Sequence, residues 1–115
     1  MNIKLGVVMD PIENINPTKD STLAMLLAAQ TRGWSLYYML PESLCFSEGT
    51  VKATSTELRV YDDDKNWFEF GITKDQATTD LDAIIMRKDP PFDMDFIYAT
   101  YLLEEAARKG TIVLD

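Results

Sequence analysis

Four short apolar runs, separated by two segments with a helical pattern, constrain the fold of this chain more than any other feature. Such runs are typical of strands that are buried on both faces of a parallel sheet. A chain of 115 residues is long enough for one hydrophobic core. We therefore predict one domain with a doubly wound α/β fold. The runs are Ile3 to Met9, Trp34 to Leu40, Leu81 to Met86 and Thr111 to Leu114, the last as a final buried strand.

Two helices are expected, and each has a start signal and a stop signal. Asp20 is suited to cap the first helix, which runs through DSTLAMLLAAQTR and ends at Gly33. Asp93 is suited to cap the second, from about Met94 to Lys109, and Gly110 ends it. These helices connect the apolar runs in the order that a parallel sheet requires.

The middle of the chain predicts an inserted β-hairpin. VKATSTELRVY alternates with a period of two residues, and NWFEFG is a short aromatic strand. We expect a hairpin or meander over Thr50 to Phe70, appended to the parallel sheet, with its tip at Asp62 to Lys65. The adjacent carboxylates of this tip favour a solvated turn over a metal site.

Polar loops follow the first and third apolar runs. The first strand leads into DPIENINPTK (residues 10–19), and the third leads into MRKDPPFD (residues 86–93). Right-handed crossovers and the usual strand orders place these two strands side by side. Both loops then leave the same edge of the sheet, where open α/β proteins bind their ligands. We therefore predict one shared site, with an ordinary solvated loop as the alternative.

These two loops supply the candidate binding residues. The guanidinium of Arg87 can hold a carboxylate through two parallel hydrogen bonds, which lysine cannot copy. Lys88 and Asp89 are expected to shape the same loop. Lys19 and the amides at the start of the helix favour an anion, although capping alone can explain Asp20 and Ser21. The opposite wall is predicted to contain Asp10, Asn16, Lys19 and Ser21.

The connection over residues 10–19 is longer than most loops between a strand and a helix. We expect it to be mobile in this chain.

Composition excludes several classes of function. The net charge of -8 argues against nucleic acid or an anionic membrane as partner, and no apolar run approaches the ~20 residues of a membrane span. The absence of histidine removes Ser-His-Asp and Cys-His catalysis. G-x-G-x-x-G and the P-loop pattern are also absent. The single cysteine, Cys45, forms no intrachain disulfide and is expected to be a buried thiol, and we predict a cytoplasmic protein.

The second predicted helix has more apolar surface than one core contact needs. Phe96, Ala99, Leu103, Ala106 and Ala107 form the core stripe. A second face suggests contact with another domain or subunit, unless aromatic residues of the hairpin cover it. Its members are Met94, Ile97, Tyr98, Tyr101 and Leu102, of which Ile97, Tyr98 and Tyr101 are the predicted interface residues.

Two long stretches carry a family resemblance. LGVVMDPIENINPTKDSTLAMLLAAQTRGW and DAIIMRKDPPFDMDFIYATYLLEEAARKGTIVLD resemble the N-terminal part of bacterial glutathione synthetase, an ATP-grasp ligase. The resemblance is strong at both ends of the chain and weak over residues 43–79.

The resemblance implies a Rossmann-like (pre-ATP-grasp) substrate domain over residues 1–115, with the ATP-grasp domains beyond Asp115. In this family, ATP phosphorylates the cysteinyl carboxylate of γ-glutamylcysteine, and glycine attacks the acyl phosphate while magnesium neutralises the phosphates. The family's enzymes are homo-oligomers, usually tetramers.

For this chain, the resemblance implies no catalytic residue, metal or cofactor of its own and no activity in isolation. The alternative is a module for oligomerisation or domain docking without substantial substrate contact.

Overall fold

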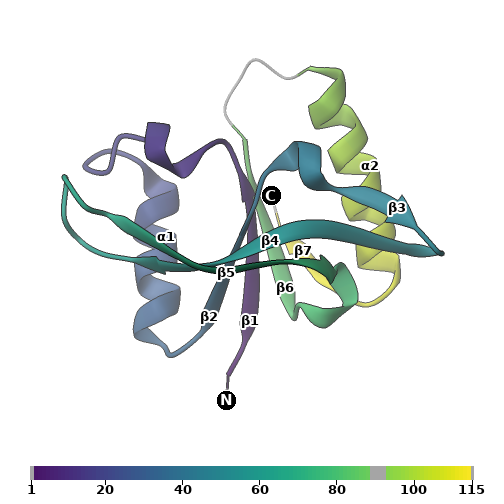
Figure 1. The fold of residues 1–115 in the computed structure, drawn as a ribbon, viewed down its shortest axis with the longest axis horizontal. Helices are drawn as coiled ribbons and strands as arrows, with labels where there is room; N and C mark the ends of the chain where they lie inside the picture. The colour runs from purple at the N-terminus through teal and green to yellow at the C-terminus, as the bar shows by residue number, and fades with distance from the viewer. Residues whose placement is uncertain (1, 89–92, 115) are drawn as a thin grey trace.

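A seven-stranded sheet lies between two helices (Figure 1). The computed structural model describes residues 2–88 and 93–114, without the side chain of Asp95. Three short 3-10 turns, η1 (Ile12–Asn14), η2 (Pro41–Ser43) and η3 (Thr78–Asp80), lie in the connections. The strands and helices are β1 (Lys4–Met9), α1 (Ser21–Thr31), β2 (Ser35–Met39), β3 (Cys45–Ser47), β4 (Thr50–Val60), β5 (Phe68–Ala77), β6 (Ala83–Arg87), α2 (Met94–Arg108) and β7 (Ile112–Leu114).

The predicted parallel strands form one half of the sheet. The strand order is β3-β4-β2-β1-β6-β7, and β5 pairs with β4 outside this path. β2, β1, β6 and β7 run parallel to one another, whereas β2 is antiparallel to its other neighbour, β4. The predicted contact between the first strand and the strand that ends near Met86 is confirmed, because Val8 of β1 pairs with Met86 of β6. The mixed α/β class is therefore confirmed.

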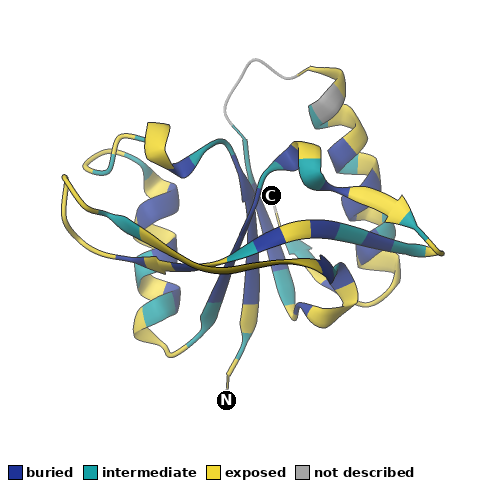
Figure 2. Cartoon of the chain, in the orientation of Figure 1, coloured by how far each residue is buried: buried dark blue, intermediate teal, exposed yellow. Residues whose placement is uncertain are grey.

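Helices α1 and α2 cover opposite faces of these parallel strands, and each face has its own buried cluster. Leu5, Val7 and Met9 of β1 belong to the cluster on the α1 side. Val8, between them, belongs to the cluster on the α2 side. This alternation follows from the two-residue period of a strand. Figure 2 shows the upright strands as largely buried, as the apolar run in the sequence predicts.

The predicted hairpin is present but longer than expected. β4 and β5 are antiparallel, and residues 61–67 connect them, as predicted for the acidic tip. β5 continues to Ala77, well past the predicted end at Phe70. Its residues 69–75 are exposed, and the apolar alternation of Phe68, Phe70 and Ile72 does not continue at Lys74, so pairing with β4 rather than burial defines this strand.

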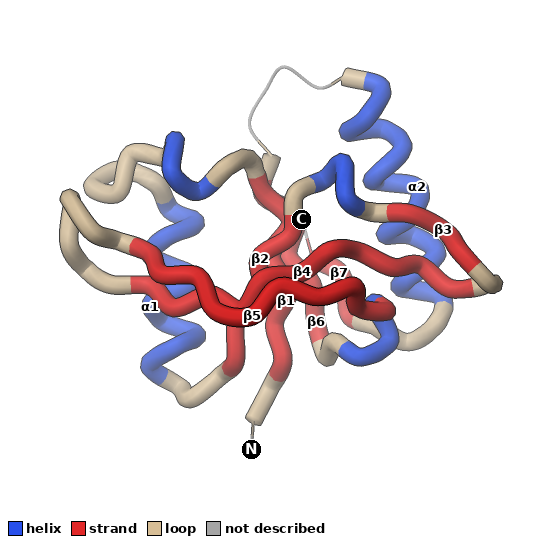
Figure 3. Tube along the Cα trace, in the orientation of Figure 1, coloured by secondary structure: helices blue, strands red, loops and turns tan. Residues whose placement is uncertain are grey.

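β4 contributes to both hydrophobic clusters. Val51 and Ala53 pack on the α2 side, whereas Leu58 and Val60 pack on the α1 side. The burial pattern changes where the pairing with β5 shifts register, between Thr56 and Leu58. Figure 3 shows β4 and β5 crossing in front of the upright parallel strands. The hairpin of β4 and β5 thus crosses the parallel strands of the sheet.

Two predicted buried features are exposed. β7 is parallel to β6 as expected, but Ile112 and Leu114 are 61% and 54% exposed. A strand at the sheet edge has one neighbour, so its apolar sequence does not guarantee burial. Cys45 is also exposed, because it lies in β3 rather than in a buried turn.

No helix in the described part of the chain has the length and apolar character needed to cross a membrane.

Candidate functional site

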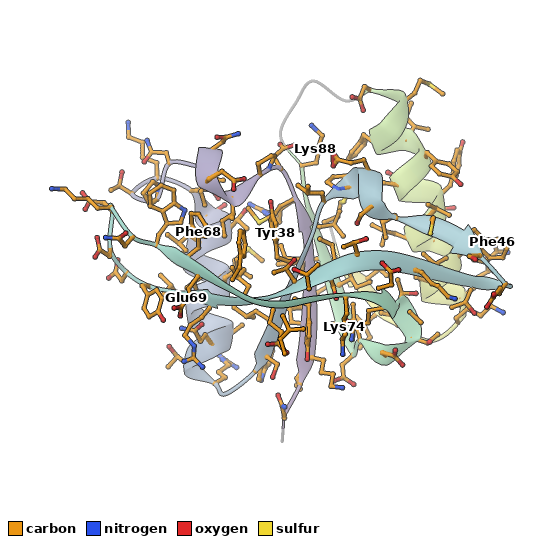
Figure 4. All side chains as sticks on the ribbon, viewed as in Figure 1. Tyr38, Phe46, Phe68, Glu69, Lys74 and Lys88 are labelled. Carbon is orange, nitrogen blue, oxygen red and sulfur yellow. The ribbon has the colours of Figure 1, made fainter. Side chains whose placement is uncertain are left out.

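A cavity of about 420 Å³ lies where β1 and β6 end and α1 begins. We call it the strand-end pocket. Its lining comes from three segments: residues 9, 10 and 15, residues 19–22, and residues 86–88. Lys88 projects from the end of β6 in Figure 4. The two polar loops predicted to share one site therefore contribute to one pocket.

Asp10 and Lys88 link the two neighbouring strands at the pocket. The parallel register places Met9 opposite Arg87. The residues that follow them, Asp10 and Lys88, therefore lie close together. Lys88 Nζ lies 3.1 Å from Asp10 Oδ1. Both side chains are partly exposed, at 16% and 32%, so solvent screens this ion pair. The pair fixes the positions of the charges more than it stabilises the fold.

Arg87 spans the pocket from β6 to the first turn of α1. Its Nε donates to Thr22 Oγ1 at 3.1 Å, and its NH2 donates to Ser21 Oγ at 2.6 Å. A guanidinium has five N–H donors in a fixed plane, so these two bonds leave donors for a further acceptor. The arginine is thus held in one orientation by neutral hydroxyl groups.

The first turn of α1 completes the pocket wall. Asp20 Oδ1 accepts a hydrogen bond from Thr22 N at 2.7 Å, which confirms Asp20 as the helix cap. The amino end of a helix carries a partial positive charge. Lys19, Arg87 and Lys88 add three cations, against the carboxylates of Asp10 and Asp20. An anion is therefore the ligand class that this wall favours.

The structure brings together five of the seven residues predicted for substrate binding. Asn16 does not line the pocket: its Oδ1 accepts from Thr18 N at 3.1 Å and from Thr18 Oγ1 at 2.8 Å. It shapes the turn before α1 instead. Asp89 lies outside the described residues. The five that line the pocket are Asp10, Lys19, Ser21, Arg87 and Lys88. Their contact with a substrate stays a prediction.

Sequence reasoning missed the groups that support the pocket. The hydroxyl of Thr22, for which the sequence analysis predicts no role, accepts from Arg87. Ile12, within the loop over residues 10–19, is fully buried. Its N–H donates to the Tyr38 hydroxyl at 3.2 Å, and its carbonyl accepts from Trp67 Nε1 at 3.0 Å. No local signal could reveal these partners, because they are 26 and 55 residues away in the chain.

Burial raises the pKa of the Tyr38 hydroxyl. The hydrogen bond from Ile12 N–H acts in the opposite direction, and the nearby carboxylates of Glu13, Glu42 and Asp10 raise the pKa further. Tyr38 is consequently a neutral hydroxyl at ordinary pH, which can accept the bond from the loop.

The outer face of α2 lies away from the strand-end pocket. Ile97, Tyr98 and Tyr101 are 41%, 55% and 64% exposed, whereas Leu102, expected on the same face, is buried. Aromatic residues of the hairpin do not cover this face. Phe68 packs on the α1-side cluster, and Phe70 stacks on Tyr38 with ring centroids 5.2 Å apart. Ile97, Tyr98 and Tyr101 are therefore left uncovered by the described residues of the hairpin.

Comparison with known proteins identifies the family. The family model described as prokaryotic glutathione synthetase, N-terminal domain, matches residues 3–115. The chain belongs to this family. It is 53% identical over 115 residues to glutathione synthetase of Pseudomonas putida, and 55% and 52% identical over 113 residues to those of Yersinia pestis and Escherichia coli K12.

These glutathione synthetases are much longer than the chain. The matches cover 100%, 98% and 98% of the chain, but only 36%, 35% and 36% of the three relatives. The chain thus spans about a third of their length. The predicted resemblance to this family is confirmed over the whole chain, including the middle where the motifs were weak.

Proposed function

We propose that this chain is the substrate-binding N-terminal domain of a glutathione synthetase. The full-length enzyme would join γ-glutamylcysteine and glycine, with ATP cleavage and an acyl phosphate intermediate. The family match and the strand-end pocket support this proposal. The fold is assigned, in finer terms, as a Rossmann-like, pre-ATP-grasp domain over residues 1–115.

The orientation of Arg87 carries the proposal. Ser21 and Thr22 hold its guanidinium across the pocket without neutralising its charge. A carboxylate of γ-glutamylcysteine can accept hydrogen bonds from the remaining donors of the same plane. Lys19 lines the same cavity, and Lys88 is held beside it by Asp10. The role of the domain is then to bind and orient an anionic substrate.

ATP and magnesium are assigned to domains outside this chain. Among residues 2–88 and 93–114, no group of three or more acidic or cysteine side chains is placed to hold a metal ion, and the chain has no histidine. Because the chain spans only about a third of the length of its relatives, we expect it to be inactive alone. The full-length enzyme is expected to be a cytoplasmic homo-oligomer, a tetramer as in the family.

Replacement of Arg87 by alanine tests the proposal. A charge-assisted hydrogen bond contributes ~1.5 to 3 kcal/mol, so Arg87→Ala should weaken substrate handling by roughly tenfold to a hundredfold. The measurement is kcat/KM for γ-glutamylcysteine, in a full-length glutathione synthetase whose N-terminal domain has this sequence. Arg32→Ala is the matched control, because Arg32 is exposed at the opposite end of α1. Equal kinetics for the two variants would remove Arg87 from the site.

A second candidate function is oligomerisation or docking of the missing domains through α2. The exposure of Ile97, Tyr98 and Tyr101 favours it. Exposed apolar patches of this kind mark contact surfaces in soluble proteins. Replacing both tyrosines by serine should reduce self-association in sedimentation velocity, while the free energy of unfolding changes by no more than ~0.5 kcal/mol. Sedimentation as a strict monomer before any substitution would remove the oligomer branch of this candidate.

A further inference from the structure

Two aromatic side chains bind the backbone of one residue, Ile12, in the loop over residues 10–19, which we call the pocket loop. Ile12 belongs to η1, between Asp10 and Ile15, which both line the strand-end pocket. Tyr38 Oη accepts from Ile12 N–H, and Trp67 Nε1 donates to Ile12 O. Both polar groups of a fully buried residue are thereby satisfied. The path of the loop depends on groups that do not line the pocket.

The two aromatic residues come from different parts of the sheet. Tyr38 lies in the parallel strand β2, whereas Trp67 lies just before β5, at the end of the hairpin connection. The carbonyl of Trp67 also accepts from Tyr61 N at 2.9 Å, which closes the hairpin. The hydrogen bond from Trp67 to Ile12 therefore connects the β4–β5 hairpin to the pocket loop.

Aromatic contacts connect the two side chains that bind Ile12. Trp67 packs edge-on against Phe68 with centroids 5.6 Å apart, and Phe68 lies 5.1 Å from Phe70. Phe70 in turn stacks on Tyr38 at 5.2 Å. Figure 4 labels Tyr38 on β2 and Phe68 on β5, two strands that both pair with β4. The four rings form a continuous chain from one hydrogen bond of Ile12 to the other.

We propose that Trp67 is a positioning residue for the strand-end pocket, acting through the carbonyl of Ile12. The inference rests on the proposed substrate site. The indole N–H fixes η1, and η1 sets where Asp10 and Ile15 stand relative to Arg87. Asp10 then orients Lys88 through their ion pair. The hairpin thus contributes to substrate affinity without touching the substrate.

Loss of the indole N–H should loosen the loop without dismantling the core. Phenylalanine keeps an aromatic ring at residue 67 but cannot donate to Ile12 O. Loss of an uncharged hydrogen bond of this kind corresponds to roughly a two- to tenfold change in the equilibrium between the closed and the open loop. Because the loop forms one wall only, the change should appear in substrate binding rather than in the chemical step.

Trp34→Phe is the matched control. Trp34 is the only other tryptophan of the chain, and it is likewise half-buried against the α1-side cluster. It lines a different cavity, near the other end of α1. Both substitutions remove one indole from the same hydrophobic cluster, so their difference isolates the bond to Ile12.

The test combines kinetics with hydrogen exchange. In a full-length glutathione synthetase whose N-terminal domain has this sequence, Trp67→Phe should raise KM for γ-glutamylcysteine about three- to tenfold and change kcat by less than about twofold. Trp34→Phe should leave both within about twofold. In the 115-residue chain, amide exchange of Ile12 and Ile15 should accelerate by a similar factor in Trp67→Phe alone.

Equal KM values for the two tryptophan variants, or unchanged exchange at Ile12 and Ile15, would overturn the proposal. Should Trp67→Phe fail to fold, Tyr38→Phe replaces it, since it removes the other bond to Ile12 and keeps the ring that stacks on Phe70. The comparison of Arg87→Ala with Arg32→Ala tests the proposed substrate site independently of Trp67. An unaffected Arg87 variant with accelerated loop exchange would reject the proposed function and keep the role of Trp67 in holding the loop.

Discussion

Helices α1 and α2 are built alike on their inner faces and differently on their outer faces. Each follows a parallel strand, and each begins with an aspartate cap: Asp20 accepts from Thr22 N and Asp93 from Phe96 N. The exposed face of α1 carries mostly small or polar residues, whereas that of α2 carries two tyrosines and an isoleucine. The same structural unit thus builds a pocket with one helix and leaves an exposed apolar face on the other.

The largest expected effects test the similarity of the inner faces. Leu26 of α1 and Leu103 of α2 are 0% and 3% exposed in their respective clusters. Replacing either by alanine should lower the free energy of unfolding by ~2 to 5 kcal/mol, from lost burial and the cavity left behind. Urea denaturation of the two variants measures this. A cost below ~1 kcal/mol at Leu103 alone would mean that α2 is only loosely attached to the sheet.

Smaller effects are expected from the two caps. Asp20→Ala and Asp93→Ala should each lower the free energy of unfolding by ~0.5 to 2 kcal/mol, because one amide of the first turn loses its acceptor. Thermal and urea denaturation of the two variants measure the loss, with Asp75→Ala, in the exposed strand β5, as the control. Only the Asp20 variant should also alter exchange of the Thr22 amide beside Arg87. If Asp93→Ala also changed the exchange of the Thr22 amide, the N-termini of α1 and α2 would not be independent of each other.

The smallest expected effect is confined to alkaline pH and concerns the α1 side. The pKa of Tyr38 is raised in the folded protein, so its contribution to stability is complete below about pH 10 and is lost as the pH rises further. Tyr38→Phe should flatten the decline in stability above pH 10. Denaturant titrations at pH 8 and at several alkaline values compare it with the native chain. The same decline in both would show that other groups control alkaline unfolding.

The elements that position the pocket could be predicted from local patterns. Apolar runs gave the parallel strands, and Asp20 with Gly33 gave the limits of α1. The position of charged residues after two neighbouring strands indicated a common site, and Lys19 and Arg87 do line one cavity. These inferences succeed because each depends on sequence neighbours and on the handedness of the crossover.

Long-range pairing could not be predicted in the same way. Strand β5 is exposed along most of its length, and its apolar alternation stops after Ile72, before the strand ends. The loop over residues 10–19 was expected to be mobile, but the structure gives Ile12 partners from β2 and from the hairpin connection. A single sequence contains no signal for bonds between residues so far apart. The mobility of this loop stays a prediction, which amide hydrogen exchange tests.

Strand β4 belongs to both hydrophobic clusters, through Val51 and Ala53 on one side and Leu58 and Val60 on the other. Neither cluster can open completely without disrupting the same eleven-residue strand. The α1 half and the α2 half should therefore melt in one cooperative transition, as small domains usually do. The slowest-exchanging amides on both sides of the sheet would then report a single global free energy rather than two subglobal ones.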